Sequence, residues 1–261
     1  MRKELNIALV QSNLAWENAE GNFAIFNQHL EKIKEADLIV LPEMFSTGFS
    51  MNPAPLAESM QGKTMNWLTQ KAKEKNCVIT GSFIAEEKGK YFNRLVWMRA
   101  DGSFELYDKR HLFRMAGENS LYTEGQKKLI VELKGWKICP LICYDLRFPV
   151  WSRNVNREYD ILLYIANWPA VRSHPWKTLL PARAIENQCY VLGLNRVGKD
   201  GNNLDYSGDS SVIDPLGKYV AEAVPGKEEI VFVKLNDAFL EQCRANFPVN
   251  LDGDKFSLNL D

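Results

Sequence analysis

The sequence lacks the segments that mark membrane and secreted proteins. None of its apolar runs is long enough to span a bilayer. The first residues, Met1 to Leu5, continue directly into a strand-like segment and contain no apolar core of a signal peptide. We therefore expect a cytoplasmic protein that has no membrane partner.

Cysteine and histidine are scarce, and neither is arranged as a metal site. The five cysteines are odd in number and widely scattered, which favours free thiols in a reducing compartment. The three histidines have no metal-ligand spacing, and no glycine-rich phosphate loop of standard spacing is present. We expect no metal and no cofactor. The residues concerned are Cys77, Cys139, Cys143, Cys189 and Cys243, and His29, His111 and His174.

Charge of one sign is not in excess. The chain of 261 residues has 32 basic and 33 acidic residues and a net charge of −1. This balance argues against nucleic acid or an anionic membrane as an obligatory partner. No internal repeat, low-complexity tract or Pro/Gly-rich linker divides the chain, so we expect a single domain over residues 1–261. The tail from about residue 247 is polar and is expected to be irregular.

Strand-like and helix-like segments alternate along the chain, which predicts an α/β fold with helices covering apolar strands. Strands are expected at residues 5–11, 37–41, 77–85, 92–99, 104–107, 129–133, 137–142, 161–166, 190–195, 210–213 and 230–234. Helices are expected at residues 19–34, 64–75, 150–155, 176–187 and 237–245, and Thr64 is the expected N-cap of the second helix.

Cys143 stands at the end of the apolar strand 137–142. The proline of Phe148-Pro149, just beyond it, fits the first turn of a helix. A cysteine at such a turn is held on rigid backbone, and we expect the helix N-terminus to favour its thiolate, the nucleophilic form. A lone cysteine is more often a small core hydrophobe, which is the role we expect for Cys139.

Three charged residues are candidates to act with Cys143. Glu43 follows a buried strand after a proline, Lys109 follows the strand 104–107, and Glu118 lies in the next loop. Ligands of open α/β sheets bind at the carboxyl ends of strands. Each of the three, taken alone, also fits an ordinary surface residue.

Together these positions resemble the nitrilase superfamily of carbon–nitrogen hydrolases. Its members have Leu-Pro-Glu, then Tyr-x-Lys-x-His-Leu-Phe, then a second Glu, then Cys-Tyr-Asp-x-Arg-Phe-Pro. The sequence matches this order at Glu43, Lys109, Glu118 and Cys143. The resemblance implies a four-layer α-β-β-α sandwich and a homodimer, for which residues 148–151 and the helix 176–187 are candidate contacts.

The resemblance also implies a covalent mechanism for hydrolysing a small-molecule amide. Cys143 would attack the amide carbon and form a thioester, with Glu43 as the base. Lys109 and the backbone N–H of Tyr144 would stabilise the oxyanion, and Glu118 would hold the lysine.

Within the superfamily, residues 110–118 and 167–172 resemble the bacterial ω-amidase-like branch. That branch hydrolyses the distal amide of small 2-oxo acids such as 2-oxoglutaramate and 2-oxosuccinamate. Such a substrate carries a carboxylate opposite its amide, which suits an arginine. We expect Arg172 to bind it and Trp168 to wall the pocket, although Arg172 also fits a solvated loop residue.

Other readings of the sequence stay open. The chain is also compatible with a nitrilase, an N-carbamoyl hydrolase, an amidase for a deaminated peptide, or a catalytically silent scaffold. Near Cys143, we expect Asp145 and Arg147 to form an ion pair that stabilises the turn. His111 fits either a hydrogen-bonding role near the site or a structural one.

Overall fold

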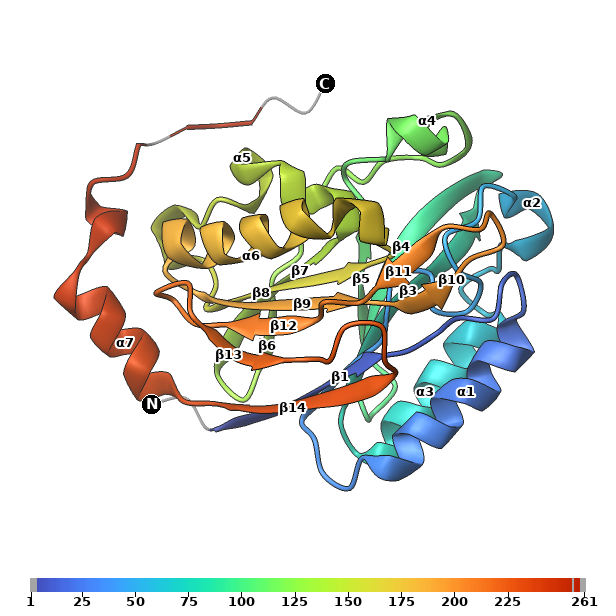
Figure 1. Ribbon diagram of the computed structural model, residues 1–261, viewed down its shortest axis with the longest axis horizontal. Helices are drawn as coiled ribbons and strands as arrows, with labels where there is room; N and C mark the ends of the chain where they lie inside the picture. The colour runs from blue at the N-terminus through green and yellow to red at the C-terminus, as the bar shows by residue number, and fades with distance from the viewer. Residues whose placement is uncertain (1–3, 255, 259–261) are drawn as a thin grey trace.

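Two six-stranded sheets lie face to face between layers of helices in the computed structural model, which describes residues 4–254 and 256–258 (Figure 1). The strand order is β14-β1-β2-β3-β4-β5 in the first sheet and β13-β12-β9-β8-β7-β6 in the second. This arrangement confirms both the α/β class and the four-layer α-β-β-α sandwich.

The strands of the first sheet are β1 (Leu5–Gln11), β2 (Leu38–Val40), β3 (Val78–Glu87), β4 (Lys90–Met98), β5 (Phe104–Asp108) and β14 (Glu229–Leu235). Those of the second are β6 (Val131–Leu133), β7 (Trp136–Ile142), β8 (Ile161–Ala166), β9 (Tyr190–Asn195), β12 (Ser211–Ile213) and β13 (Tyr219–Glu222). A small hairpin joins β10 (Val197–Lys199) to β11 (Asp205–Ser207).

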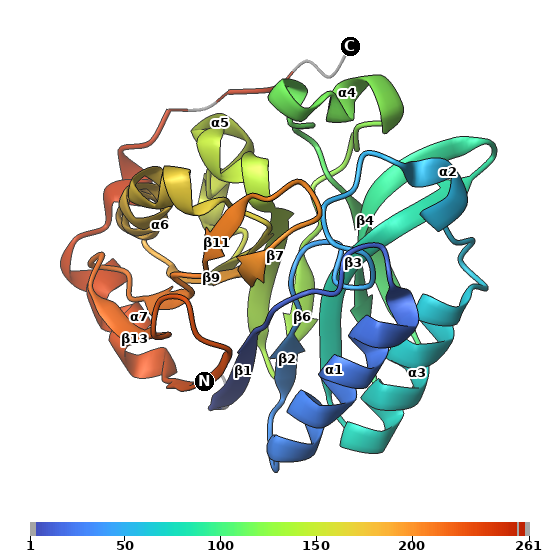
Figure 2. The same cartoon turned by 45° about the vertical axis from the view of Figure 1, so that its right-hand side comes forward.

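The α-helices are α1 (Ala19–Lys32), α2 (Pro53–Leu56), α3 (Lys63–Lys75), α4 (Glu118–Leu121), α5 (Pro149–Ser152), α6 (Ser173–Asn187) and α7 (Asp237–Asn246). Short 3₁₀ turns are η1 (Arg114–Ala116), η2 (Cys143–Arg147), η3 (Val155–Arg157), η4 (Ala170–Arg172) and η5 (Val249–Leu251). Figure 2 shows α1 and α3 side by side on the outer face of the first sheet, while α6 lies over the second sheet.

The alternation of side chains along β1 explains the layering. Leu5, Ile7 and Leu9 belong to the core between the two sheets, whereas Ala8 and Val10 pack in the core beneath α1 and α3. Successive side chains of a strand point to opposite faces, so a strand buried on both sides must be apolar throughout. Each large apolar side chain buried in this way contributes about 1.5–3 kcal/mol.

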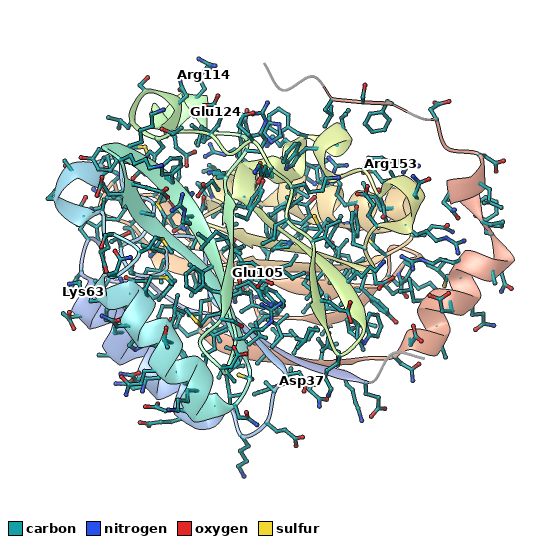
Figure 3. The ribbon with its side chains drawn as sticks, turned by 180° about the vertical axis from the view of Figure 1, so that it is seen from behind. Asp37, Lys63, Glu105, Arg114, Glu124 and Arg153 are labelled. Atoms are coloured by element: carbon teal, nitrogen blue, oxygen red, sulfur yellow. The ribbon has the colours of Figure 1, made fainter. Side chains whose placement is uncertain are left out.

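The strand directions bring several carboxyl ends to one edge of the sandwich. β1, β2 and β3 run parallel in the first sheet, and β7, β8 and β9 run parallel in the second. At the opposite edge, Lys134 in the β6–β7 turn donates to the carboxylate of Asp37, just before β2, at 2.9 Å. Figure 3 labels Asp37 at that edge and Arg114 and Glu124 at the other.

Some expected details differ from the structure. Thr64 is not the N-cap of α3, because the helix begins one residue earlier, after Gly62. The carboxylate of Glu58 takes over the capping role and accepts from the N–H of Thr64 at 2.8 Å and from its hydroxyl at 2.7 Å. A side chain from a preceding turn gives no local signal of this kind. None of the helices in the described part of the chain is long and apolar enough to cross a membrane.

The chain ends are only partly described. After α7, the 3₁₀ turn Val249–Leu251 interrupts the tail that was expected to be irregular. The expected irregular tail also includes residues 255 and 259–261, which lie outside the described residues. Residues 1–3 lie outside them as well.

Candidate active site

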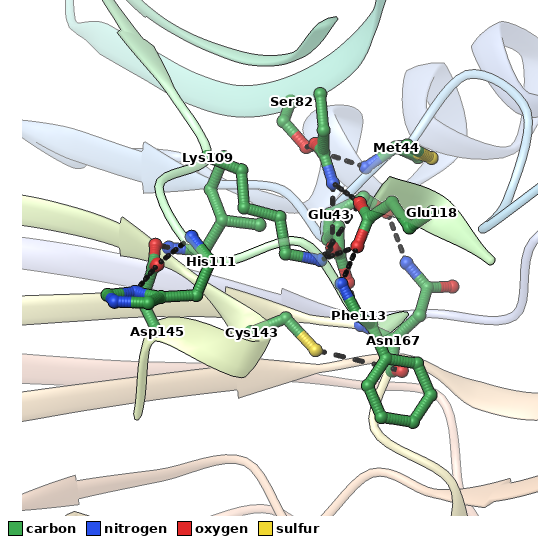
Figure 4. Close-up of polar contacts among 12 residues, drawn as sticks. Glu43, Met44, Ser82, Lys109, His111, Phe113, Glu118, Cys143, Asp145 and Asn167 are labelled. Carbon is green, nitrogen blue, oxygen red and sulfur yellow. Dashed lines mark hydrogen bonds and ion pairs between the residues drawn. The ribbon is translucent and has the colours of Figure 1, made fainter. Parts of the chain in front are cut away.

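Four side chains from different segments of the chain meet at the edge where the carboxyl ends of β2, β5 and β7 lie (Figure 4). Glu43 follows β2, Lys109 and Cys143 directly follow β5 and β7, and Glu118 begins α4. The side chains of Glu43, Lys109 and Glu118 are completely buried, and Cys143 is 9% exposed. The structure thus brings together the four residues expected to act jointly, whereas their catalytic roles stay predictions.

Lys109 lies between the two carboxylates. Its Nζ donates to Glu43 Oε1 at 2.9 Å and to Glu118 Oε1 and Oε2 at 3.1 and 2.9 Å. Burial by itself would lower the pKa of Lys109, but the charges of Glu118 and Glu43 outweigh it and raise that pKa above its usual value. The lysine is therefore a permanent cation in this site.

Glu118 has a donor for every lone pair of its carboxylate. Besides the two contacts with Lys109, Oε1 accepts from Asn93 Nδ2 at 3.3 Å, and Oε2 accepts from the N–H of Phe113. Burial raises the pKa of Glu118, Lys109 lowers it, and Glu43 raises it, with a net rise. A carboxylate surrounded by four donors has no oxygen lone pair left for a substrate proton.

Glu43 differs from Glu118 in having room for one more partner. Its Oε1 accepts from Lys109 and from Asn93 Nδ2, the latter at 2.8 Å, and its Oε2 accepts from the N–H of Asn167 at 2.7 Å. Among the residues that the structure describes, one lone pair of Oε2 therefore receives no N–H donor. This carboxylate is the one positioned to take and return a proton.

Cys143 has a strained backbone and a buried thiol. Its φ is +45°, in the left-handed region, and its Sγ lies 3.9 Å from the carbonyl oxygen of Asn167. Burial and the negative charge of Glu43 raise the pKa of the thiol well above its usual value, and Lys109 only partly offsets them. The expected preference for the thiolate is thus wrong for the resting site, because the short turn η2 does not outweigh burial. Cys143 needs a base.

Asp145 does not pair with Arg147, contrary to expectation. Its Oδ1 accepts from the N–H and Nδ1 of His111 at 2.9 and 2.8 Å. Its Oδ2 accepts from Tyr107 Oη at 2.7 Å and from the N–H of Ile142 at 3.0 Å. Asp145 is completely buried, so neighbouring backbone and ring donors satisfy it without an arginine. His111, stacked on a phenylalanine ring, has a structural role in holding this turn.

A pocket with a cavity volume of about 100 Å³ opens beside Cys143. Its lining is mostly apolar and aromatic and includes Phe49, Phe113, Tyr144, Trp168 and Tyr206. Pockets for small molecules commonly combine such walls with a few convergent polar groups. The hairpin β10–β11 supplies part of one wall, although that stretch of the chain has no strand-like pattern.

Arg172 and Arg147 supply the positive charge of the pocket. Arg172 lies in η4 with its guanidinium 5.3 Å from the ring of Phe113, and Arg147 lies in η2 at 5.1 Å from the ring of Trp168. Trp168 is buried and donates its indole N–H to the carbonyl oxygen of Arg172 at 2.7 Å. Arg172 and Trp168 therefore lie beside the site as expected, while their contact with a substrate stays a prediction.

Sequence reasoning missed the two amides that hold Glu43. Asn93, in β4, falls within the expected strand 92–99, and Asn167, after β8, falls within the segment 167–172. Neither was singled out, because a buried asparagine cannot be distinguished from an exposed one by its neighbours. Cys139, in contrast, is a buried core residue as expected. No group of three or more His, Cys, Asp or Glu side chains suited to a metal ion occurs in residues 4–254 and 256–258.

Comparisons with known proteins agree with this geometry. The carbon-nitrogen hydrolase family model matches residues 6–245. The omega-amidase YafV of Escherichia coli is 48% identical over 97% of this chain and 98% of its own length. A 2-oxoglutaramate amidase of Bacillus subtilis is 33% identical over 93% of this chain and 95% of its own. A crystal structure of a CN-hydrolase superfamily protein from Xanthomonas campestris has a TM-score of 0.96 at 44% identity and covers 98% of this chain and 100% of its own.

Proposed function

The chain belongs to the carbon–nitrogen hydrolase family, and from this premise we propose that it hydrolyses the distal amide of small 2-oxo dicarboxylic acid monoamides. 2-Oxoglutaramate and 2-oxosuccinamate are the expected substrates, and the acid and ammonia are the products. The observation that carries the proposal is the buried cluster of Glu43, Lys109 and Glu118 beside Cys143. The names of the Escherichia coli and Bacillus subtilis relatives support the substrate class.

The first half of the reaction forms a thioester. The thiol proton of Cys143 moves to the free lone pair of Glu43 Oε2 as the sulfur attacks the amide carbon. Glu43 then gives this proton to the departing nitrogen, the C–N bond breaks, and ammonia leaves. A single carboxylate serves as base and acid in turn, which agrees with its one vacant lone pair.

The second half returns the enzyme to its resting state. Glu43 takes a proton from water while the water oxygen attacks the thioester carbon. The C–S bond breaks, the acid leaves, and Cys143 recovers its proton. Lys109 and the backbone N–H of Tyr144 stabilise the oxyanion of both tetrahedral intermediates. Loss of one such donor typically slows the reaction about 10²–10³-fold.

The carboxylate end of the substrate would bind to Arg172. Its guanidinium is fixed over Phe113 by a cation–π contact and faces the same pocket as Cys143. Arg147 lines the pocket as well and would add a second cation for the carboxylate. Trp168 and Tyr144 would form apolar walls between the carboxylate end and the amide end of the substrate. These walls would exclude water from the amide.

We propose one domain over residues 1–261 and a cytoplasmic homodimer. The five cysteines are free and buried, which suits a reducing compartment. Val150 in α5 is 51% exposed and Ile185 in α6 is 55% exposed, and both lie in the segments expected to form the dimer contact. Replacing either with Asp should yield monomers by light scattering at the concentration at which the unchanged protein is dimeric.

Ammonia release by the purified protein tests the proposed function. The panel contains 2-oxoglutaramate, 2-oxosuccinamate, an N-carbamoyl amino acid, a deaminated peptide amide and a short aliphatic nitrile. We expect the two ω-amides to react fastest. Faster reaction of another class would reassign the enzyme within its family, and no reaction with any compound would favour the scaffold.

A further inference from the structure

We propose that Asn93 is a positioning residue that holds Glu43 and Glu118 as charged carboxylates, and that Ser82 fixes its orientation. The inference rests on the proposed role of Glu43 as the base. Asn93 lies in β4 and Ser82 in the neighbouring strand β3, and both side chains are completely buried. Neither residue lines the pocket beside Cys143.

The hydrogen bonds define which way the Asn93 amide points. Ser82 Oγ accepts the N–H of Met44 at 2.8 Å, so its own hydrogen is donated to Asn93 Oδ1, also at 2.8 Å. The NH₂ of Asn93 consequently faces the two carboxylates, to Glu43 Oε1 at 2.8 Å and to Glu118 Oε1 at 3.3 Å. A flipped amide would place an oxygen against two carboxylates, which is strongly unfavourable.

This arrangement has two consequences for Glu43. Asn93 and Lys109 together fill both lone pairs of Oε1, so proton transfer is directed to Oε2 on the other side. In addition, Asn93 donates without adding charge. The cluster therefore keeps two carboxylates against one ammonium, and the excess negative charge preserves the ability of Glu43 to accept a proton.

Loss of Asn93 should change the titration of the site. The titratable groups that face Glu43 are Lys109, Glu118, Cys143 and Tyr122. A hydrogen bond to the charged form of a carboxylate favours that form, so its removal favours protonation. The acid limb of the pH profile of kcat should consequently move to higher pH. Because Asn93 has no contact with the pocket, KM should change little.

Three variants test the inference. Asn93→Leu removes both donors at similar volume, and Ser82→Ala removes the group that orients the amide. Thr80→Val is the matched control, because Thr80 is a completely buried hydroxyl two residues earlier on β3 that bonds to the carbonyl oxygen of Val96 instead. We expect kcat to fall about 10–100-fold in Asn93→Leu and about tenfold in Ser82→Ala, with little change in Thr80→Val.

The pH profile separates positioning from a general structural role. The acid limb should move upward in Ser82→Ala, which keeps the amide, and in Asn93→Leu if that variant folds. An unchanged profile and a normal kcat in Ser82→Ala would overturn the inference. The pH dependence of the rate at which iodoacetamide alkylates Cys143 tests the same effect without a substrate. This pH dependence should differ between Ser82→Ala and Thr80→Val, even if none of the proposed amides is hydrolysed.

Discussion

Lys109 Nζ lies 2.9 Å from Glu43 Oε1, and both side chains are completely shielded from solvent. A buried pair of this kind is costly to form, because both charges lose their hydration. Glu118 adds a second carboxylate to the same ammonium, so one cation faces two anions. Such a cluster contributes little to stability, and its presence beside the thiol of Cys143 is typical of a functional site.

Replacing Lys109 with methionine should affect both folding and rate. Lys109→Met leaves two carboxylates buried without a counter-charge, and we expect a loss of about 3–5 kcal/mol in the free energy of unfolding. Turnover should fall at least about 10²–10³-fold, because the cation beside the oxyanion is lost. Urea unfolding and steady-state rates measure the two effects. Adding Glu118→Gln should recover stability and leave turnover low, and a fully stable, active Lys109→Met would contradict the assignment.

Cys143→Ala should fold normally and have no measurable hydrolysis. Alanine keeps the Cβ of cysteine, so the positive φ of residue 143 is no more strained than before. Iodoacetamide should modify Cys143 ahead of the other four cysteines, because Cys143 lines the pocket and the neighbouring Glu43 can take its proton. Cys243 is the internal control, since it has the same exposed fraction of 9%. Peptide mapping that found Cys243 or Cys139 modified first, with activity retained in Cys143→Ala, would refute the assignment.

Arg172→Ala should discriminate between substrates. We expect kcat/KM for 2-oxoglutaramate to fall about 10–100-fold, because a charge-assisted contact with the carboxylate is lost. A short neutral aliphatic amide should be affected little. Arg147→Ala is the companion variant, since Arg147 lines the same pocket from η2. Equal losses on both substrates would indicate a structural role for Arg172, and no loss on either would remove it from the site.

Much of the first sheet was predictable from the sequence, because the apolar runs that mark its strands lie within short stretches of the chain. β1 begins and ends at the expected residues, Leu5 and Gln11. Continuous apolar runs bounded by turn residues identify such strands. The strand-end positions of Glu43, Lys109 and Cys143 followed from the same reasoning, although the proximity of the first sheet to the second rested on the family resemblance.

The remainder of the site depends on contacts between distant segments. Asn93 and Glu43 are 50 residues apart, and the residues around either one do not indicate that the two side chains form a hydrogen bond. The hairpin that carries Tyr206 was missed because its strands have three residues each and a polar turn. The state of the Cys143 thiol also required the structure, since burial outweighs the local turn.

The buried thiols should make stability fall in alkaline solution. Burial raises the pKa of Cys77 and of Cys139 to about 12, whereas an unfolded thiol has a pKa of about 8.5. The folded state therefore retains protons that the unfolded state releases, and the stabilising contribution is complete only below about pH 8.5. The free energy of unfolding should decline by about 1.4 kcal/mol per pH unit for each such thiol above about pH 9. In Cys77→Ala, urea titrations at a series of pH values should give a plot of unfolding free energy against pH whose slope is shallower by about that amount. Parallel plots for Cys77→Ala and the unchanged protein would contradict the burial of Cys77.

The thioester on Cys143 is the most direct measure of the proposed chemistry. The protein is mixed with 2-oxoglutaramate, quenched with acid during the first turnover, digested, and analysed by mass spectrometry. We expect the peptide containing Cys143 to gain the mass of the substrate minus ammonia, and we expect no such adduct in Cys143→Ala. Release of ammonia without an adduct at Cys143, or with the adduct on another cysteine, would contradict the proposed chemistry.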